Sequence, residues 1–210
     1  MTSSETPGIG AINRAFPADH DFPAAPYREL ALAESGARRI TSLDRAMPGL
    51  LRPIVTVRNA LTGNFPPEKV EGYVAAMEAR QLRLNEKLAE GTLRIRSLIG
   101  LAALRSCTPE MAAHTLTMMR RGYEVGLIDR ELTGDDLGGD AVDHSVVLDG
   151  SHGGLYVQQD PERAASVKEY FVAGYSDQQA GFAELHETLA EQVVGTGELV
   201  ERLETIQSSH

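Results

Sequence analysis

Tryptophan is absent from the 210 residues of this chain, and cysteine occurs once, at Cys107. A single cysteine excludes an intrachain disulfide and a zinc site built from several thiolates. Aromatic residues make up 5% of the sequence, which argues against an array of stacking side chains for single-stranded nucleic acid. No apolar run approaches the ~18 residues of a membrane-spanning helix, and residues 1–25 hold no signal-peptide pattern. We therefore expect a cytoplasmic protein without a membrane segment.

Positive charge is also scarce, because 20 Lys and Arg residues face 30 Asp and Glu residues, a net charge of −10. This balance argues against direct binding to nucleic acid. The charge is uneven, since residues 1–107 carry a net +3 and residues 108–210 a net −13. Like charges repel within a compact fold, so we expect the two halves to pack together and form ion pairs.

Apolar periodicity and the positions of Pro and Gly predict the order of the helices and strands. Residues 1–25 show no period and are expected to form a flexible or extended arm. Helices are predicted at 26–46, 50–61, 66–90, 109–122, 160–174 and 176–207, and strands at 93–99, 125–132, 142–148 and 155–158. This order predicts one α+β domain over residues 26–210, with a helical front and long C-terminal helices around a small antiparallel β-meander. It shows no βαβ alternation.

Three motifs in this order resemble those of a known family. Met47-Pro48-Gly49-Leu50-Leu51 resembles an I-P-G-L-L-Q-T motif, with Arg52-Pro53 in place of the Gln-Thr. Pro67 to Glu71, followed by Arg80-Gln81, is similar to P-E-E-V-E…R-x-x-R-Q, and residues 155–171 are similar to Y-L-E-D-P-E-E-V-x-x-Y-x-x-x-F. The chain thus resembles, over about residues 28–192, the C-terminal ligand-binding-like domain of actinobacterial XRE-type helix-turn-helix, antitoxin-like transcriptional regulators.

The resemblance implies a sensor-like domain. Residues 1–25 are too few for the DNA-binding domain that precedes it in the family, so we expect a stand-alone regulator-like domain without its own DNA reader. Its expected partner is a small hydrophobic or anionic molecule, with no cofactor and no metal. Two alternatives remain open: a biosynthetic enzyme recruited from the regulator fold, such as a cofactor-independent cyclase or isomerase acting on a hydrophobic natural product, or a partner subunit of a DNA-binding or toxin-like protein. A homodimer is expected through apolar residues of the C-terminal helices, namely Leu185, Leu189, Val193, Leu199, Val200 and Leu203.

Two groups of residues are candidates for ligand binding. The first is a Met-rich set that lines either a pocket or an ordinary core: Met111, Leu116, Met118, Met119, Tyr123 and Tyr156. The second is Arg94 and Arg96, which the alternation of the predicted strand places on one face as a paired site for an anion.

Titratable residues near the predicted hairpin are the candidates for catalysis. His144, His152 and Asp149 flank the turn and are able to serve as general acid and base or as metal ligands, although turn residues are usually solvated. Asp135 and Asp136 lie in an acidic loop that is either a weak cation site or a solvated connection. Cys107 precedes a helix and is either a reactive thiol or, as we favour, a buried structural one.

Overall fold

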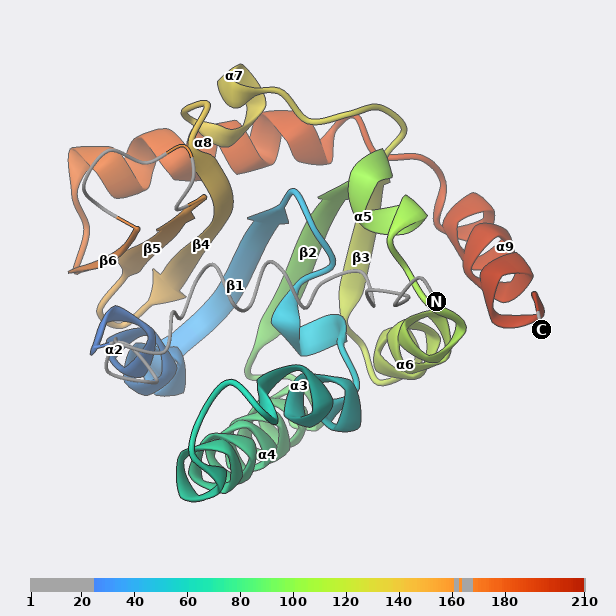
Figure 1. The fold of residues 1–210 in the computed structure, drawn as a ribbon. Helices are drawn as coiled ribbons and strands as arrows, with labels where there is room; N and C mark the ends of the chain where they lie inside the picture. Colours follow the sequence, from blue (N-terminus) through green and yellow to red (C-terminus); the bar gives the residue numbers. More distant parts are fainter. Residues whose placement is uncertain (1–24, 161–162, 164–167, 210) are drawn as a thin grey trace.

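The computed structural model describes residues 25–160, 163 and 168–209, which form a six-stranded sheet with helices on both faces (Figure 1). The strand order is β3-β2-β1-β4-β5-β6. β1, β2 and β3 are parallel, and β4, β5 and β6 continue the sheet in antiparallel pairs from β1. The strands are β1 (Ala37–Asp44), β2 (Arg94–Gly100), β3 (Glu124–Ile128), β4 (Val142–Gly150), β5 (Gly154–Gln159) and β6 (Glu169–Ala173).

Helices connect the parallel strands and cover the sheet. They are α2 (Ala25–Ala33), α3 (Ile54–Leu61), α4 (Pro67–Ala89), α5 (Leu101–Arg105), α6 (Pro109–Arg120), α7 (Gly134–Leu137), α8 (Asp177–Ala190) and α9 (Thr196–Gln207), with short 3-10 turns η1 (Glu34–Gly36) and η2 (Gly49–Leu51). Since α3 and α4 connect β1 to β2, and α5 and α6 connect β2 to β3, these are βαβ crossovers. The expectation that such units are absent is therefore wrong.

The two faces of the sheet pack against different helices. Ile40, Ile95 and Val146 belong to a core shared with α2, α4, α6 and α9. Leu43 and Leu98 belong to a core on the opposite face, shared with α7 and α8. Figure 1 shows α8 crossing the sheet and α9 beyond β3, and α9 contacts both α6 and β3. The opposite faces follow from the two-residue period of a strand.

The expected α+β class is confirmed to the extent that helices and a sheet of mixed direction form the described fold. The expected small meander is not a separate sheet, because β4, β5 and β6 form one half of the larger sheet. The helices predicted at 50–61, 66–90 and 109–122 and the strands predicted at 93–99 and 142–148 correspond to observed elements. The arm prediction falls on residues that, Ala25 excepted, lie outside those described.

Two helix predictions are wrong. Residues 37–44, placed in a helix over 26–46, form the central strand β1, which pairs with β2 on one side and β4 on the other. Residues 169–173, placed in a helix over 160–174, form β6, which pairs with β5. In both segments the ladder hydrogen bonds of neighbouring strands outweigh a local helical pattern, because β propensity depends on tertiary context. The expected break near Gly195 separates α8 from α9.

Ion pairs connect the two oppositely charged halves of the chain. Among the described residues, those that cross between residues 1–107 and 108–210 include Arg39–Asp149, Arg39–Glu187, Arg45–Asp143, Arg96–Glu124 and Arg105–Glu131. Most of these side chains are largely exposed, so each pair contributes little to stability. In the described part of the chain, no helix is both long enough and apolar enough to cross a membrane.

Candidate functional site

A cavity of about 170 Å³ lies between one face of the sheet and the segment formed by α2, η2, α3 and α4. Its floor includes Ile40, Ser42 and Asp44, which are alternate residues of β1 and therefore point to the same face. Buried apolar side chains form much of the wall, among them Met47, Leu61 and Met77. The site is thus an apolar chamber whose floor carries a carboxylate.

Asp44 and His144 form a dyad on this floor. The register of β1 and β4 pairs the two residues directly, and His144 Nδ1 lies against Asp44 Oδ1. Ser42 Oγ donates a hydrogen bond to Asp44 Oδ2 at 2.7 Å, and the Oγ atoms of Ser42 and Ser97 lie 3.0 Å apart. The His144 ring packs edge-on against Tyr156, with centroids 5.7 Å apart. These contacts hold the carboxylate and the imidazole in one arrangement.

The second ring nitrogen of His144 is available to a bound molecule. Among the described residues, none forms a hydrogen bond with His144 Nε2, while the side chain lines the cavity and is 22% exposed. A carboxylate on Nδ1 fixes the tautomer and orientation of an imidazole, which is the arrangement used in general acid–base catalysis. The dyad is therefore able to accept or donate a proton at Nε2.

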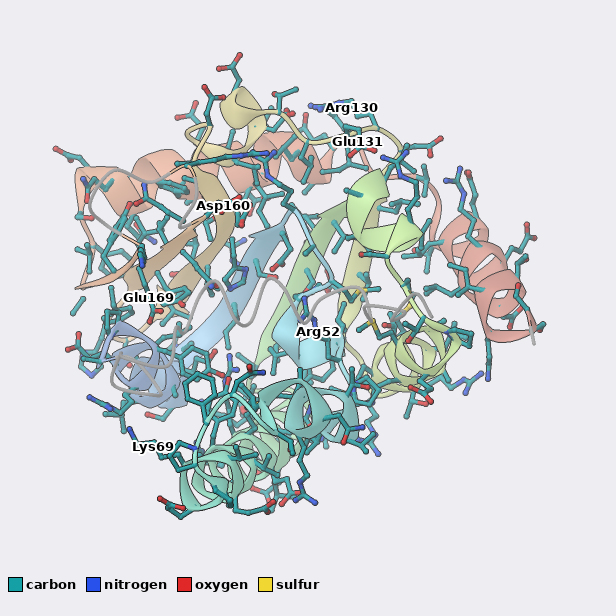
Figure 2. The ribbon with its side chains drawn as sticks, viewed as in Figure 1. Arg52, Lys69, Arg130, Glu131, Asp160 and Glu169 are labelled. Carbon is teal, nitrogen blue, oxygen red and sulfur yellow. The ribbon has the colours of Figure 1, made fainter. Side chains whose placement is uncertain are left out.

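Arg52 is a buried cation on the cavity wall. It is the C-cap residue of η2, in extended conformation, and the next residue, Pro53, is the N-cap of α3. The residue is 8% exposed, and its Nε donates to the carbonyl oxygen of Met47 at 2.8 Å. Burial lowers the pKa of the guanidinium, and the charge of Asp44 partly offsets that effect. Figure 2 shows Arg52 near the middle of the molecule, beside η2 and close to α3.

Arg80 is a second buried cation, and it is fully engaged. Its Nε and Nη2 donate to the two carboxylate oxygens of Glu34 at 2.6 and 2.5 Å, and its Nη1 donates to the Tyr27 hydroxyl at 2.9 Å. In the helix predicted over residues 66–90, charged side chains are expected on the exposed face and apolar ones on the buried face, so Arg80 is expected to be exposed and Leu82 to be buried. The structure reverses both assignments, since Arg80 is 8% exposed and Leu82 is 61% exposed. The tertiary partner Glu34, on another element, decides the outcome.

Glu169 adjoins the site from β6. Its carboxylate accepts a hydrogen bond from the Tyr27 backbone N–H at 3.0 Å and one from the side chain of Tyr156. Burial raises the pKa of Glu169 to about 7, although both hydrogen bonds favour the charged form. Figure 2 places Glu169 beside α2. The carboxyl group therefore exchanges its proton near neutral pH.

The three predicted catalytic residues do not come together. His144 lies at the start of β4 and lines the cavity, whereas Asp149 lies at the other end of that strand. Asp149 pairs with Arg39 at 3.3 Å and accepts from the Tyr175 hydroxyl at 3.1 Å. His152 is exposed in the turn after β4. A strand rises about 3.3 Å per residue, so the extended length of β4 keeps His144 away from the turn.

The predicted ligand-pocket residues divide between two places. Tyr156 lines the cavity, where burial raises its pKa well above the usual range. Met111 and Met118 are core residues on the buried face of α6. Leu116, Met119 and Tyr123 border a separate surface groove between α6, β3 and α9.

The residues expected at a dimer contact pack within the chain. Leu189, Leu199 and Leu203 are buried in the two cores, and Leu185, Val193 and Val200 pack against them. Most of this apolar surface is therefore used by the fold of a single chain.

The remaining candidates also lie away from the cavity. Arg96 pairs with Glu124 at 2.9 Å, and Arg94 is exposed on the same strand. Asp136 is held by Arg130 through hydrogen bonds of 2.6 and 2.7 Å, which keep its pKa well below the usual range. Cys107 is buried, and burial raises the pKa of its thiol to about 11, which disfavours the reactive thiolate.

Sequence reasoning missed Asp44, Ser42 and Glu34 because it placed residues 26–46 in a single helix. A strand over 37–44 gives Ile40, Ser42 and Asp44 one face, and that alternation is the signal that was available. Arg52 is one of many arginines in the sequence, and no local pattern predicts that it is buried. Among residues 25–160, 163 and 168–209, no cluster of three or more His, Cys, Asp or Glu side chains is arranged to hold a metal ion.

Comparison with models of known protein families and with curated protein sequences finds no match for this chain.

Proposed function

We propose that this protein binds a small organic molecule in the cavity above β1. The observation that supports the proposal is the combination of an apolar wall with an inward-facing polar set, which is typical of small-molecule sites. The cavity measures about 170 Å³. An apolar cavity of ~150 Å³ in another protein takes up benzene, so a single substituted ring is a suitable probe. The resemblance to regulator domains supports a sensor-like role for such binding.

Methionine methyl NMR tests this binding directly. The chain holds six methionines, of which Met47 and Met77 line the cavity, while Met111 and Met118 are buried residues of α6 that are not among its lining residues. Titration with toluene is expected to shift the Met47 and Met77 signals in a saturable way and to leave the other two in place. Shifts that spread evenly over the four signals, or no shift at all, contradict the proposal.

A matched pair of variants provides the control. Ala46 lines the cavity and is exposed, so Ala46→Trp is expected to obstruct the cavity without disturbing the core. Ala76 is exposed on α4 away from the cavity, so Ala76→Trp adds the same side chain without that effect. The first variant is expected to abolish the Met47 and Met77 shifts and the second to retain them.

A second function, acid–base catalysis on the bound molecule, is favoured by the Asp44–His144 dyad. A general base needs a free nitrogen facing the substrate and a partner that stabilises the imidazolium, and this pair supplies both. This reading corresponds to the alternative of a cofactor-independent cyclase or isomerase. The test uses any molecule that co-purifies with the native protein, returned to fresh protein in D₂O. Deuterium uptake at carbon is expected with the natural sequence and not with His144→Gln; equal uptake by both proteins contradicts it.

A further inference from the structure

We propose that the molecule bound in this cavity is a carboxylate with an apolar body and that Arg52 binds the carboxylate group. This inference rests on the proposed binding function and specifies its ligand. It starts from a difference between the two buried arginines near the cavity. Both are 8% exposed, yet only one of them has its guanidinium fully paired inside the fold.

Arg80 shows how this fold satisfies a buried guanidinium. All three of its nitrogen atoms donate hydrogen bonds, two to the Glu34 carboxylate and one to the Tyr27 hydroxyl. Arg52 donates from Nε alone, to the carbonyl oxygen of Met47. Among the described residues, no oxygen accepts a hydrogen bond from either Nη atom of Arg52. A guanidinium N–H without a partner inside the fold is open to an acceptor bound in the cavity, and charge-assisted hydrogen bonds of this kind are strong.

Asp44 does not supply that acceptor. Its charge attracts Arg52 from nearby, but Oδ1 contacts His144 and Oδ2 accepts the hydrogen bond from Ser42. Because Asp44 is engaged by His144 and Ser42, its carboxylate forms no hydrogen bond with Arg52. Arg52 lines the cavity, so its open Nη donors are available to a molecule bound there.

The geometry and charge of the site point to a carboxylate as the anion. A guanidinium presents two parallel N–H donors, which match the two oxygens of a planar carboxylate. A phosphate group carries more charge and is usually met by several cations or by a helix N-terminus. Among the described lining residues, Arg52 and Arg80 are the arginines and no lysine is present, and Arg80 is already paired. The single open pair of guanidinium donors therefore suits one planar carboxylate better than a phosphate.

The apolar lining of the cavity specifies the rest of the ligand. Met47, Leu61 and Met77 are buried and apolar, and methionine side chains adapt to aromatic and aliphatic shapes. A ligand whose carboxylate binds Arg52 therefore places its apolar part against these side chains. A small aromatic or aliphatic acid satisfies both requirements within the cavity volume.

The test compares benzoate with benzamide, which has nearly the same shape and no charge. Both are titrated into the natural protein while the Met47 and Met77 methyl signals are followed. Benzoate is expected to bind at least tenfold more tightly than benzamide. In Arg52→Gln that preference is expected to disappear, whereas Arg58→Gln, which alters an exposed arginine paired with Glu71, is expected to retain it. Unchanged Met111 and Met118 signals establish that the variants are folded.

Each outcome decides a different point. If benzoate and benzamide bind equally to the natural protein, the cavity binds small molecules but the carboxylate inference is wrong. If neither shifts the cavity methionines, the proposed binding function fails, and the inference fails with it. Inorganic phosphate, added as a competitor, is expected not to displace benzoate. Displacement at a comparable concentration overturns the assignment to a carboxylate in favour of a general oxyanion site. The comparison in the natural protein stands even if Arg52→Gln does not fold.

Discussion

Glu34 and Arg80 form a buried ion pair that joins η1 to α4. The two residues are 46 positions apart, and the guanidinium donates to both oxygens of the carboxylate at 2.6 and 2.5 Å. The Arg80 charge also lies 5.5 Å from the centroid of the Tyr27 ring. This pair therefore holds the start of β1 against the helix that covers the cavity.

Removal of one partner of that pair is expected to be costly. Glu34→Ala leaves an uncompensated buried guanidinium, and we expect a loss of ~3–5 kcal/mol in the free energy of unfolding. The double variant Glu34→Leu with Arg80→Met removes both charges and is expected to lose less than Glu34→Ala alone. Urea denaturation measures the three values. As a control, Arg58→Ala breaks an exposed pair with Glu71 and is expected to cost less than ~1 kcal/mol.

His186 is expected to make stability fall in acid. Its side chain is 1% exposed, its Nε2 lies 2.8 Å from Ser145 Oγ, and burial lowers its pKa to about 3. In the unfolded chain the group takes up a proton near pH ~6.5, so between that pH and about 3 the unfolded state binds the extra proton. As the pH is lowered through this window, the free energy of unfolding therefore falls by ~1.4 kcal/mol per pH unit. Urea denaturation at several pH values is expected to show a smaller slope for His186→Gln than for the natural protein; an equal slope contradicts the assignment.

Glu169 is expected to titrate near neutrality. Burial raises the pKa of this carboxyl from 4.5 to about 7, so the folded state retains a proton that the unfolded state has lost between these values. Its contribution is present below about pH 4.5 and is lost as the pH rises through 7, the opposite direction to His186. Carboxyl ¹³C NMR measures the midpoint. Tyr156→Phe removes a hydrogen bond to the charged form and is expected to raise the midpoint further; a lowered midpoint contradicts this arrangement.

Replacement of two glycines by alanine is expected to change the stability of the fold in opposite directions. At Gly150 an added Cβ lies 2.5 Å from the carbonyl oxygen of Gly36 and 2.8 Å from Ala37 Cα, both backbone atoms of the segment that enters β1. Gly150→Ala is expected to destabilise the fold by ~1–3 kcal/mol, as overpacking generally does. Gly72 lies in α4 with no atom within 4 Å of an added Cβ. Gly72→Ala is expected to stabilise by ~0.5–1 kcal/mol, because alanine is the better helix former. Thermal unfolding of both variants distinguishes the two signs.

The predicted elements that the structure confirms carry strong local signals. These signals act through the backbone of a few neighbouring residues. They are Pro67 at the start of α4, Thr108-Pro109 at the start of α6 and the alternation of β2. The single cysteine and the distribution of charge follow from composition alone. The sequence by itself therefore determined the order of most helices and strands, and it included His144 among the candidate residues.

Only the tertiary structure decided which polar residues meet at the cavity. Asp44 reaches His144 because β1, which reads locally as part of a helix, pairs with a strand a hundred positions later in the chain. Arg80 is buried because its guanidinium pairs with Glu34, 46 positions away in the chain, and Arg52 is buried next to η2, where its Nε donates to the Met47 carbonyl oxygen. Pairing register and desolvation arise from contacts between distant segments, so no local pattern in the sequence contains them.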